Sequence, residues 1–159
     1  MPHQIEAQGN YDIGVKVGTF NLRNLARPNF QFYPNSEPYD DRTYAAKCAW
    51  TAMQIDKMNA DVIVFQEVFH VSALEDVVRA SRTMRNARII ARDAVIMPTK
   101  NGLVPQVAIV TKLPLAQEPI WVTDYPHKVK ITPLGYSEPI GLITRAVPHI
   151  TVVLPNDMK

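Results

Sequence analysis

Residues 61–68 read Asp-Val-Ile-Val-Phe-Gln-Glu-Val, and this stretch decides the fold class. The apolar run at 62–65 is typical of a strand that is buried on both faces. Such a strand needs other elements layered against it, and the surrounding sequence alternates short apolar runs with helical patterns. We therefore predict a layered α/β (α+β) domain.

A helix is predicted immediately before this strand, over residues 41–58, with Asp40 or Asp41 as its cap. Its apolar positions recur every three to four residues and fall on one stripe: Tyr44, Cys48, Ala52 and Ile55. Residues 59–60 then turn the chain into the strand. Cys48 is the sole cysteine, so no internal disulfide can form, and a core role is favoured over a reactive thiol.

The first strand is predicted at residues 11–20, where Ile13, Val15 and Val17 alternate as on a strand with one buried face. It leads into Asn21. Residues 27–40 are rich in proline, asparagine and aromatic residues, which favours a long ordered loop.

A second amphipathic helix is predicted after Glu67, because Ser72 and Glu75 have capping-box spacing. Its apolar face comprises Leu74, Val77, Val78, Ser81 and Met84. Further strands are predicted at 87–96, 105–111, 120–123, 128–132 and 148–154. Pro148 limits the last of these to an edge or a late start.

The composition gives a single-domain length of 159 residues with 47% hydrophobic content. The longest apolar runs are too short to span a membrane, and residues 1–12 contain no apolar segment typical of a secretory signal. With one cysteine, these features lead us to expect a cytoplasmic protein.

The net charge of +2 is too small to indicate, by itself, a polyanionic partner such as nucleic acid. A run of arginines between the second helix and the next strand allows two interpretations, a phosphate-tracking strip or an ordinary solvated surface. Its members are Arg79, Arg82, Arg85, Arg88 and Arg92. The solvated surface is favoured because no aromatic residues of the stacking kind accompany them.

Asn21 and Glu67 follow apolar strands, which is where ligand sites collect in open α/β sheets. Glu67 could supply a carboxylate to a hard cation such as Mg²⁺, and the Asn21 amide could orient that carboxylate or contact a phosphate. The structural alternative is that Glu67 is a solvated strand-end residue and Asn21 a turn residue.

Residues 17–25, Val-Gly-Thr-Phe-Asn-Leu-Arg-Asn-Leu, resemble the first-strand motif of the endonuclease/exonuclease/phosphatase superfamily. Residues 61–68 resemble that superfamily's metal-ligand strand. Fainter similarity extends through residues 105–115 and 144–147, so the resemblance spans most of residues 11–154.

The resemblance implies a four-layer αββα sandwich, of which this chain forms about one sheet with its outer helices. Residues 1–10 would be a tail, and residues 11–159 the N-terminal part of the domain, truncated before its C-terminal half. The implied activity is divalent-metal-dependent hydrolysis of phosphodiester or phosphomonoester bonds with Mg²⁺, Mn²⁺ or Ca²⁺. Glu67 is then the metal ligand and Asn21 the catalytic amide, and Arg23 and Arg145 are candidates for substrate binding.

The superfamily's Gly-Asp-x-Asn, His-Leu and Ser-Asp-His segments do not occur in this sequence. Its histidines are His3, His70, His127 and His149, and loop or surface roles are favoured for them. We therefore expect the chain alone to be inactive. Its expected partners are a phosphate-ester substrate, with nucleic acid among the candidates, and either the missing half or a second copy over an exposed apolar sheet face. The rival hypothesis is a non-catalytic binding or interaction protein that retains the fold.

Overall fold

The computed structural model describes residues 14–96, 102–126, 129–132, 137–139 and 142–154. It has mixed α/β content, as the sequence predicts. The predicted tail at 1–10 lies outside the described residues. The elements are β1 (Val17–Leu25), α1 (Asp41–Met58), β2 (Val62–Val68), α2 (Val71–Ala80), β3 (Arg88–Ile90), β4 (Val95–Ile96), β5 (Leu103–Val104), β6 (Gln106–Thr111), β7 (Ile120–Asp124) and β8 (Leu142–His149).

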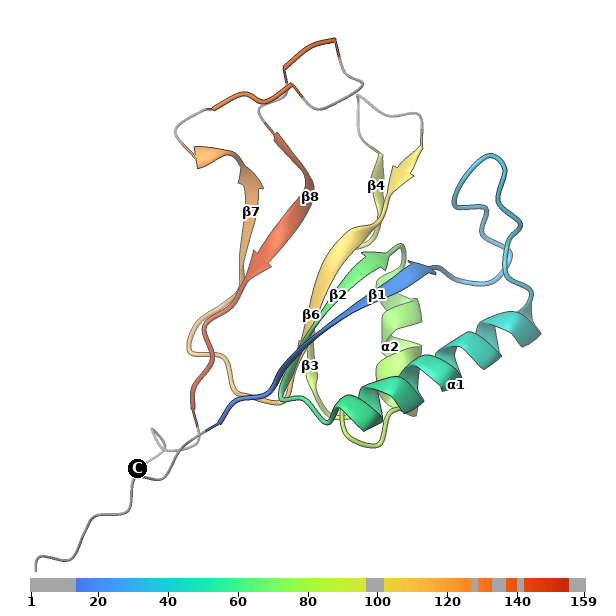
Figure 1. Cartoon of the computed structure of the whole chain (residues 1–159), viewed down its shortest axis with the longest axis vertical. Helices are drawn as coiled ribbons and strands as arrows, with labels where there is room; N and C mark the ends of the chain where they lie inside the picture. The colour runs from blue at the N-terminus through green and yellow to red at the C-terminus, as the bar shows by residue number, and fades with distance from the viewer. Residues whose placement is uncertain (1–13, 97–101, 127–128, 133–136, 140–141, 155–159) are drawn as a thin grey trace, which may run out of the picture.

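A four-stranded sheet in the order β1-β2-β6-β3 forms the centre of the molecule. β1 and β2 are parallel and are joined through α1, whereas β6 is antiparallel to both β2 and β3. Both helices cover one face of this sheet (Figure 1). The carboxyl ends of β1 and β2 therefore meet at the same edge, which places Asn21 near Glu67.

Helix α1 has the predicted bounds, and local chemistry explains both ends. The Asp40 side chain accepts a hydrogen bond from the Thr43 N–H at 2.6 Å, so Asp40 is the N-cap. Asn59 ends the helix in the left-handed region at φ 42°. All four residues of the predicted apolar stripe are buried against the sheet and α2, which confirms a core position for Cys48.

Helix α2 differs from its predicted start. Its N-cap is His70, and Ser72 lies inside the helix, so the predicted capping box is wrong. The first turn is satisfied by tertiary contact instead, because Asp93 accepts a hydrogen bond from the Val71 N–H at 2.7 Å. The helix ends at Ala80, although the apolar face predicted from the sequence remains buried beyond it as far as Met84.

The first strand is also shifted. β1 runs over residues 17–25 instead of 11–20, and Val17, predicted to be buried, is 68% exposed. β1 is an edge strand paired only with β2, so its start is open to solvent on one side. Its buried positions are Leu22 and Leu25, where α1 and α2 cover the sheet.

The strand predicted at 87–96 is two short strands, β3 and β4, separated by an irregular segment. The strands predicted near 105–111 and 120–123 are confirmed as β6 and β7. The strand predicted at 148–154 is wrong: β8 covers 142–149 and pairs antiparallel with β7. Pro148 therefore lies near the end of an edge strand, not at a start. Of the predicted strand at 128–132, the described residues 129–132 form no named strand.

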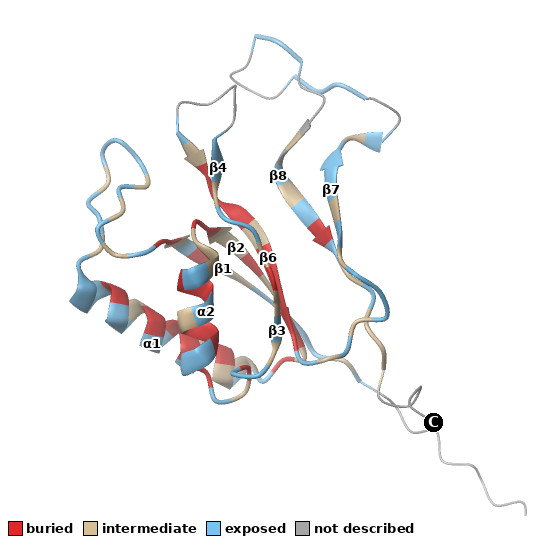
Figure 2. Ribbon diagram, turned by 180° about the vertical axis from the view of Figure 1, so that it is seen from behind, coloured by how far each residue is buried: buried red, intermediate tan, exposed pale blue. Residues whose placement is uncertain are grey.

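The other face of the sheet is partly covered, contrary to the expectation that it forms an open apolar patch. Val62, Ile90 and Ile109 are buried there, and the β7 residue Trp121 packs against them. The hairpin of β7 and β8 rises beside this face (Figures 1 and 2). Apolar side chains are instead exposed on the hairpin itself: Ile120 (51%), Val122 (39%) and Val147 (45%).

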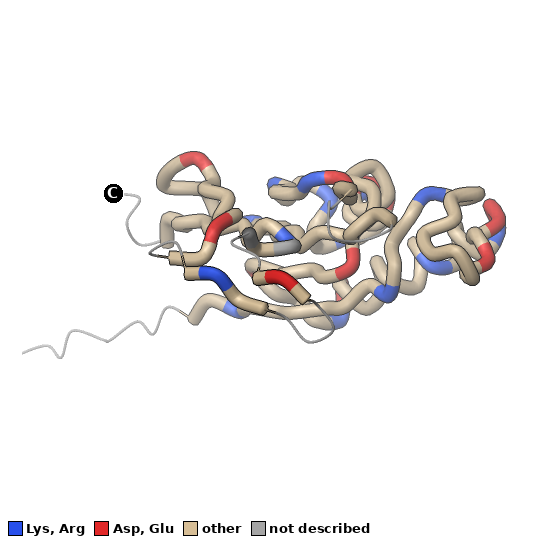
Figure 3. The backbone as a smooth tube through the Cα atoms, turned by 90° about the horizontal axis from the view of Figure 1, so that it is seen from above, with Lys and Arg blue, Asp and Glu red and all other residues tan. Residues whose placement is uncertain are grey.

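Within the part of the chain that the structure describes, no helix combines the length and apolarity needed to cross a membrane. Basic and acidic positions are interspersed along the backbone (Figure 3). Four of the five arginines in the predicted run contact other side chains. Arg79 pairs with Asp76, Arg82 with Asp56 and Arg88 with Glu118, while the Arg92 guanidinium lies 4.1 Å from the centroid of the Trp121 ring.

Candidate functional site

The side chains of Asn21 and Glu67 meet between β1 and β2. Asn21 Nδ2 donates a hydrogen bond to Glu67 Oε1 at 2.9 Å. The sheet register places Asn21 opposite Gln66, so Glu67 is one residue beyond its partner position. The convergence expected from the sequence is therefore present.

Irregular backbone produces this convergence. Arg23, Asn24 and Glu67 all lie in the left-handed region, at φ 48°, 62° and 63°. The β1–β2 ladder shifts register after Asn21, and the β2–β6 ladder shifts after Phe65. The sequence suggested that Asn21 ends its strand. In the structure Asn21 lies inside β1, at the last regular pair before a bulge. Bulges re-aim side chains, and this one lets Glu67 reach Asn21.

The bulge of β1 also binds the second carboxylate oxygen. The backbone N–H of Asn24 donates to Glu67 Oε2 at 3.0 Å, and the Asn21 Oδ1 accepts from the Arg23 N–H at 2.8 Å. The amide of Asn21 is therefore oriented by its own strand, with its N–H₂ toward the carboxylate. This arrangement fixes the plane of the Glu67 carboxylate from β1.

Tyr39 and Lys47 contact the backbone carbonyls of the bulge, and the sequence did not predict this role for either residue. The Tyr39 hydroxyl lies 3.2 Å from the carbonyl oxygens of Arg23 and Asn24, to which it can donate. Lys47 Nζ donates to the Arg23 carbonyl at 3.1 Å. Burial raises the pKa of Tyr39. Burial, together with the Arg23 guanidinium, lowers the pKa of Lys47. The aromatic content of the 27–40 loop was the only sequence signal for Tyr39.

Among the described residues, no three histidine, cysteine, aspartate or glutamate side chains gather as a metal site, and Glu67 is the carboxylate that Asn21 and Asn24 contact. Mg²⁺ is commonly held by one or two carboxylates, with substrate phosphate and water completing its coordination. Each Glu67 oxygen accepts one hydrogen bond and retains a further lone pair. The donor set therefore fits a hard cation that is held jointly by protein and substrate.

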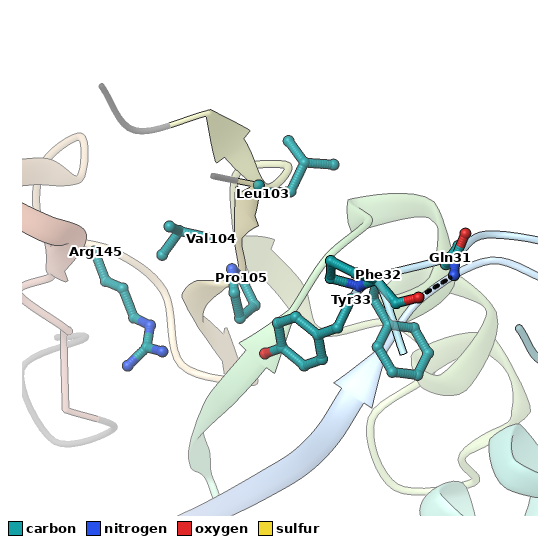
Figure 4. A pocket seen from close by; sticks show the side chains of 9 residues that line it. Gln31, Phe32, Tyr33, Leu103, Val104, Pro105 and Arg145 are labelled. Carbon is teal, nitrogen blue, oxygen red and sulfur yellow. Dashed lines mark hydrogen bonds between the residues drawn. The ribbon is translucent and has the colours of Figure 1, made fainter. Parts of the chain in front are cut away.

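The two candidate substrate-binding arginines line different cavities. Arg23 borders a space beside α1, whereas Arg145, on β8, borders a cavity of about 410 Å³. Figure 4 shows the Arg145 side chain extending from β8 toward Tyr33, with Pro105 and Val104 along the cavity wall. The Tyr33 hydroxyl lies 3.3 Å from Asn24 Oδ1, which links this cavity to the Glu67 network.

The described histidines form no hydrogen bond with the Glu67 carboxylate. His70 is the N-cap residue of α2, its Nδ1 accepts from the Arg27 N–H at 3.2 Å, and its ring makes a T-shaped contact with Phe30. Burial lowers the pKa of His70. His149 is opposite Ile120 in the β7–β8 hairpin. His3 and His127 lie outside the described residues.

Comparison with known proteins yields no match: no family model, no curated protein and no solved structure is similar to this chain at a significant level. The likeness to the endonuclease/exonuclease/phosphatase superfamily therefore rests on the sequence resemblance alone. The geometry of Asn21 and Glu67 is an observation independent of that likeness.

Proposed function

We propose that this chain carries the metal-binding part of a divalent-metal-dependent phosphoesterase of the endonuclease/exonuclease/phosphatase type. The observation that supports this function best is the 2.9 Å hydrogen bond from Asn21 to Glu67. It joins the amide and the carboxylate of the two motifs, which lie 46 residues apart in the sequence. A solvated glutamate without a role would be hydrogen-bonded to water, whereas both oxygens of Glu67 accept from protein groups, the Asn21 amide and the Asn24 N–H.

In this proposal Glu67 holds Mg²⁺, or Mn²⁺ or Ca²⁺ in its place. When bound, the cation neutralises charge on the phosphoryl oxygens of the substrate. Asn21 holds the carboxylate in position, and its second N–H is available to the phosphate. Arg23 and Lys47 add positive charge on the α1 side of the same bulge.

For proton transfer, the described residues place no histidine in hydrogen-bond contact with Glu67. Hydrolysis by in-line attack needs a base for the attacking water, and a positioned base contributes about 10²- to 10⁴-fold in rate. We therefore propose that the isolated chain binds the metal without turning substrate over.

A Mn²⁺ titration followed by electron paramagnetic resonance tests the metal site. The wild-type chain should bind one ion whose affinity falls at least about tenfold in Glu67→Gln, a change that removes the charge and keeps the shape. Glu75→Gln is the matched control, because Glu75 is exposed on α2, away from β1. Equal Mn²⁺ affinity in wild type and Glu67→Gln would show that Glu67 is not a metal ligand.

A second assay addresses the expected inactivity. With a chromogenic phosphodiester and Mg²⁺, the wild-type chain should show no turnover above the Glu67→Ala background. Metal-dependent turnover that Glu67→Ala abolishes would contradict this part of the proposal and leave Glu67 as the ligand.

The exposed apolar side chains of the β7–β8 hairpin favour the alternative of a binding protein. Ile120, Val122 and Val147 share one face, because Val122 pairs with Val147 and alternates with Trp121, which points to the sheet. A binding protein would keep its partner or self-association in Glu67→Gln and lose it in Val122→Asp. Analytical ultracentrifugation at several concentrations of the two variants separates these outcomes.

A further inference from the structure

Two cavities next to Asn21 share the side chains of Arg23, Lys47 and Trp50. The smaller has a volume of about 270 Å³ and reaches Asn21, and the larger, of about 660 Å³, reaches Tyr39. Because they share three residues, they form one groove between β1 and α1, here named the α1 groove. Its larger part lies within the usual size range of small-molecule sites.

The α1 groove contains an unusually exposed aromatic side chain. Trp50 is 53% exposed and makes a tilted contact with Phe20, with ring centroids 6.1 Å apart. A single exposed apolar residue needs no explanation by itself. Here Trp50 shares the groove with Tyr39 and Phe32, so the lining is rich in aromatic rings.

Two cations lie in the same groove. Arg23 forms no salt bridge with any residue in the described ranges. Lys47 lies 5.2 Å from the centroid of the Tyr39 ring and uses one of its three N–H donors on the Arg23 carbonyl. Both cations thus retain donors for an anion, and they line the smaller cavity together with Trp50 and Asn21.

We propose that the α1 groove binds a nucleotide unit, with its base stacked on Trp50 and its phosphate held by Arg23 and Lys47. An aromatic platform next to clustered cations is the combination that single-stranded nucleic acids require, because every base offers a face to stack and every unit carries a phosphate. This inference rests on the proposed function and names its substrate class. It places the bound phosphate near Asn21, which lines the smaller cavity.

Fluorescence anisotropy of an end-labelled single strand of about 12 nucleotides, a length typical of single-strand sites, tests the groove with EDTA present. Trp50→Ala should weaken binding about 5- to 150-fold, the range expected for loss of one stacked base. Trp50→Phe should retain most of the affinity, and Arg23→Gln should reduce it. Met53→Ala is the control, since Met53 is 46% exposed on the same helix and does not line the groove.

Competition identifies the source of the nucleotide unit. Displacement of the labelled strand by adenosine monophosphate at similar concentration supports a free nucleotide, and displacement only by an unlabelled strand supports nucleic acid. Equal binding by wild type and Trp50→Ala, with unchanged circular dichroism, would overturn the inference, as would no binding of either ligand. Since EDTA removes metal from this assay, its outcome is separate from that of the Mn²⁺ titration.

Discussion

The backbone N–H of Asn24 donates to Oε2 of Glu67 at 3.0 Å, from one parallel strand to the next. Together with the Asn21 amide on Oε1, it fixes both oxygens of the carboxylate from β1. The geometry of Glu67 is therefore set by the protein before any ligand arrives. Sites preorganised in this way lose less entropy on binding.

Asn21→Ala should weaken Mn²⁺ binding about 10- to 100-fold, the usual effect of losing a group that orients a ligand. The carboxylate would remain but would turn freely about its own torsions. The same electron paramagnetic resonance titration measures the change. Thr19→Ala serves as the control, because Thr19 is on the same strand and bonds Gln66 instead of Glu67. Unchanged affinity in Asn21→Ala would show that Asn21 does not position the ligand.

Glu67→Gly should unfold at higher denaturant concentration than Glu67→Ala. Both variants lose the carboxylate, but only glycine tolerates φ 63° without steric cost. The expected difference is about 1 kcal/mol, since a left-handed conformation costs other residues about that much. Urea unfolding followed by circular dichroism gives the comparison. Equal stability would mean that the backbone relaxes when the glutamate is removed.

Asp56→Asn should destabilise the fold by about 1–3 kcal/mol at neutral pH, the cost of weakening a buried hydrogen-bond acceptor. The Asp56 side chain is 10% exposed and accepts from the Ser81 hydroxyl at 2.6 Å and the Thr83 N–H at 3.0 Å. Burial acts to raise the pKa of Asp56, but these hydrogen bonds outweigh it and hold the pKa below the usual range.

The pH dependence of wild-type stability follows from the lowered pKa of Asp56. Because the pKa is lower in the folded chain, the stabilisation is complete above the unfolded pKa of about 3.9 and is lost as the pH falls below it. Urea unfolding at neutral pH and at a pH of about 3 should therefore show that the wild type loses free energy of unfolding on acidification, and that Asp56→Asn loses less. Glu37→Gln, a change in the exposed loop, should keep the wild-type profile.

Trp121→Ala should loosen the β7–β8 hairpin from the sheet. Trp121 packs against the cluster around Val62 and Ile109, so its loss should cost about 1–3 kcal/mol of local stability. Hydrogen exchange should accelerate in β7 and β8 and stay slow in β2. Ile120→Ala is the neighbouring control, because its side chain is half exposed. Acceleration in both variants would indicate that the hairpin is held by its own pairing.

The sequence predicted correctly those elements whose structure depends on residues close to them along the chain. Helix α1 was predicted with its bounds, a cap at Asp40 or Asp41 and its buried stripe, because helical periodicity and capping act within a few residues, and the structure shows Asp40 as the cap. The core strand β2 was predicted from its apolar run. The capping box at Ser72 failed because Asp93, more than twenty residues later, satisfies the first turn of α2.

The sequence by itself indicated that Asn21 and Glu67 belong to two strands joined by a helix, and these strands form a parallel pair. Only the tertiary structure decided that they touch. Their contact depends on left-handed backbone at Arg23, Asn24 and Glu67, a conformation that ordinary side chains disfavour and that no local pattern predicts. It is held by Tyr39 and Lys47, whose positions arise from packing between distant segments. The covering hairpin likewise depends on the contact of Trp121 with strands far from it in the chain.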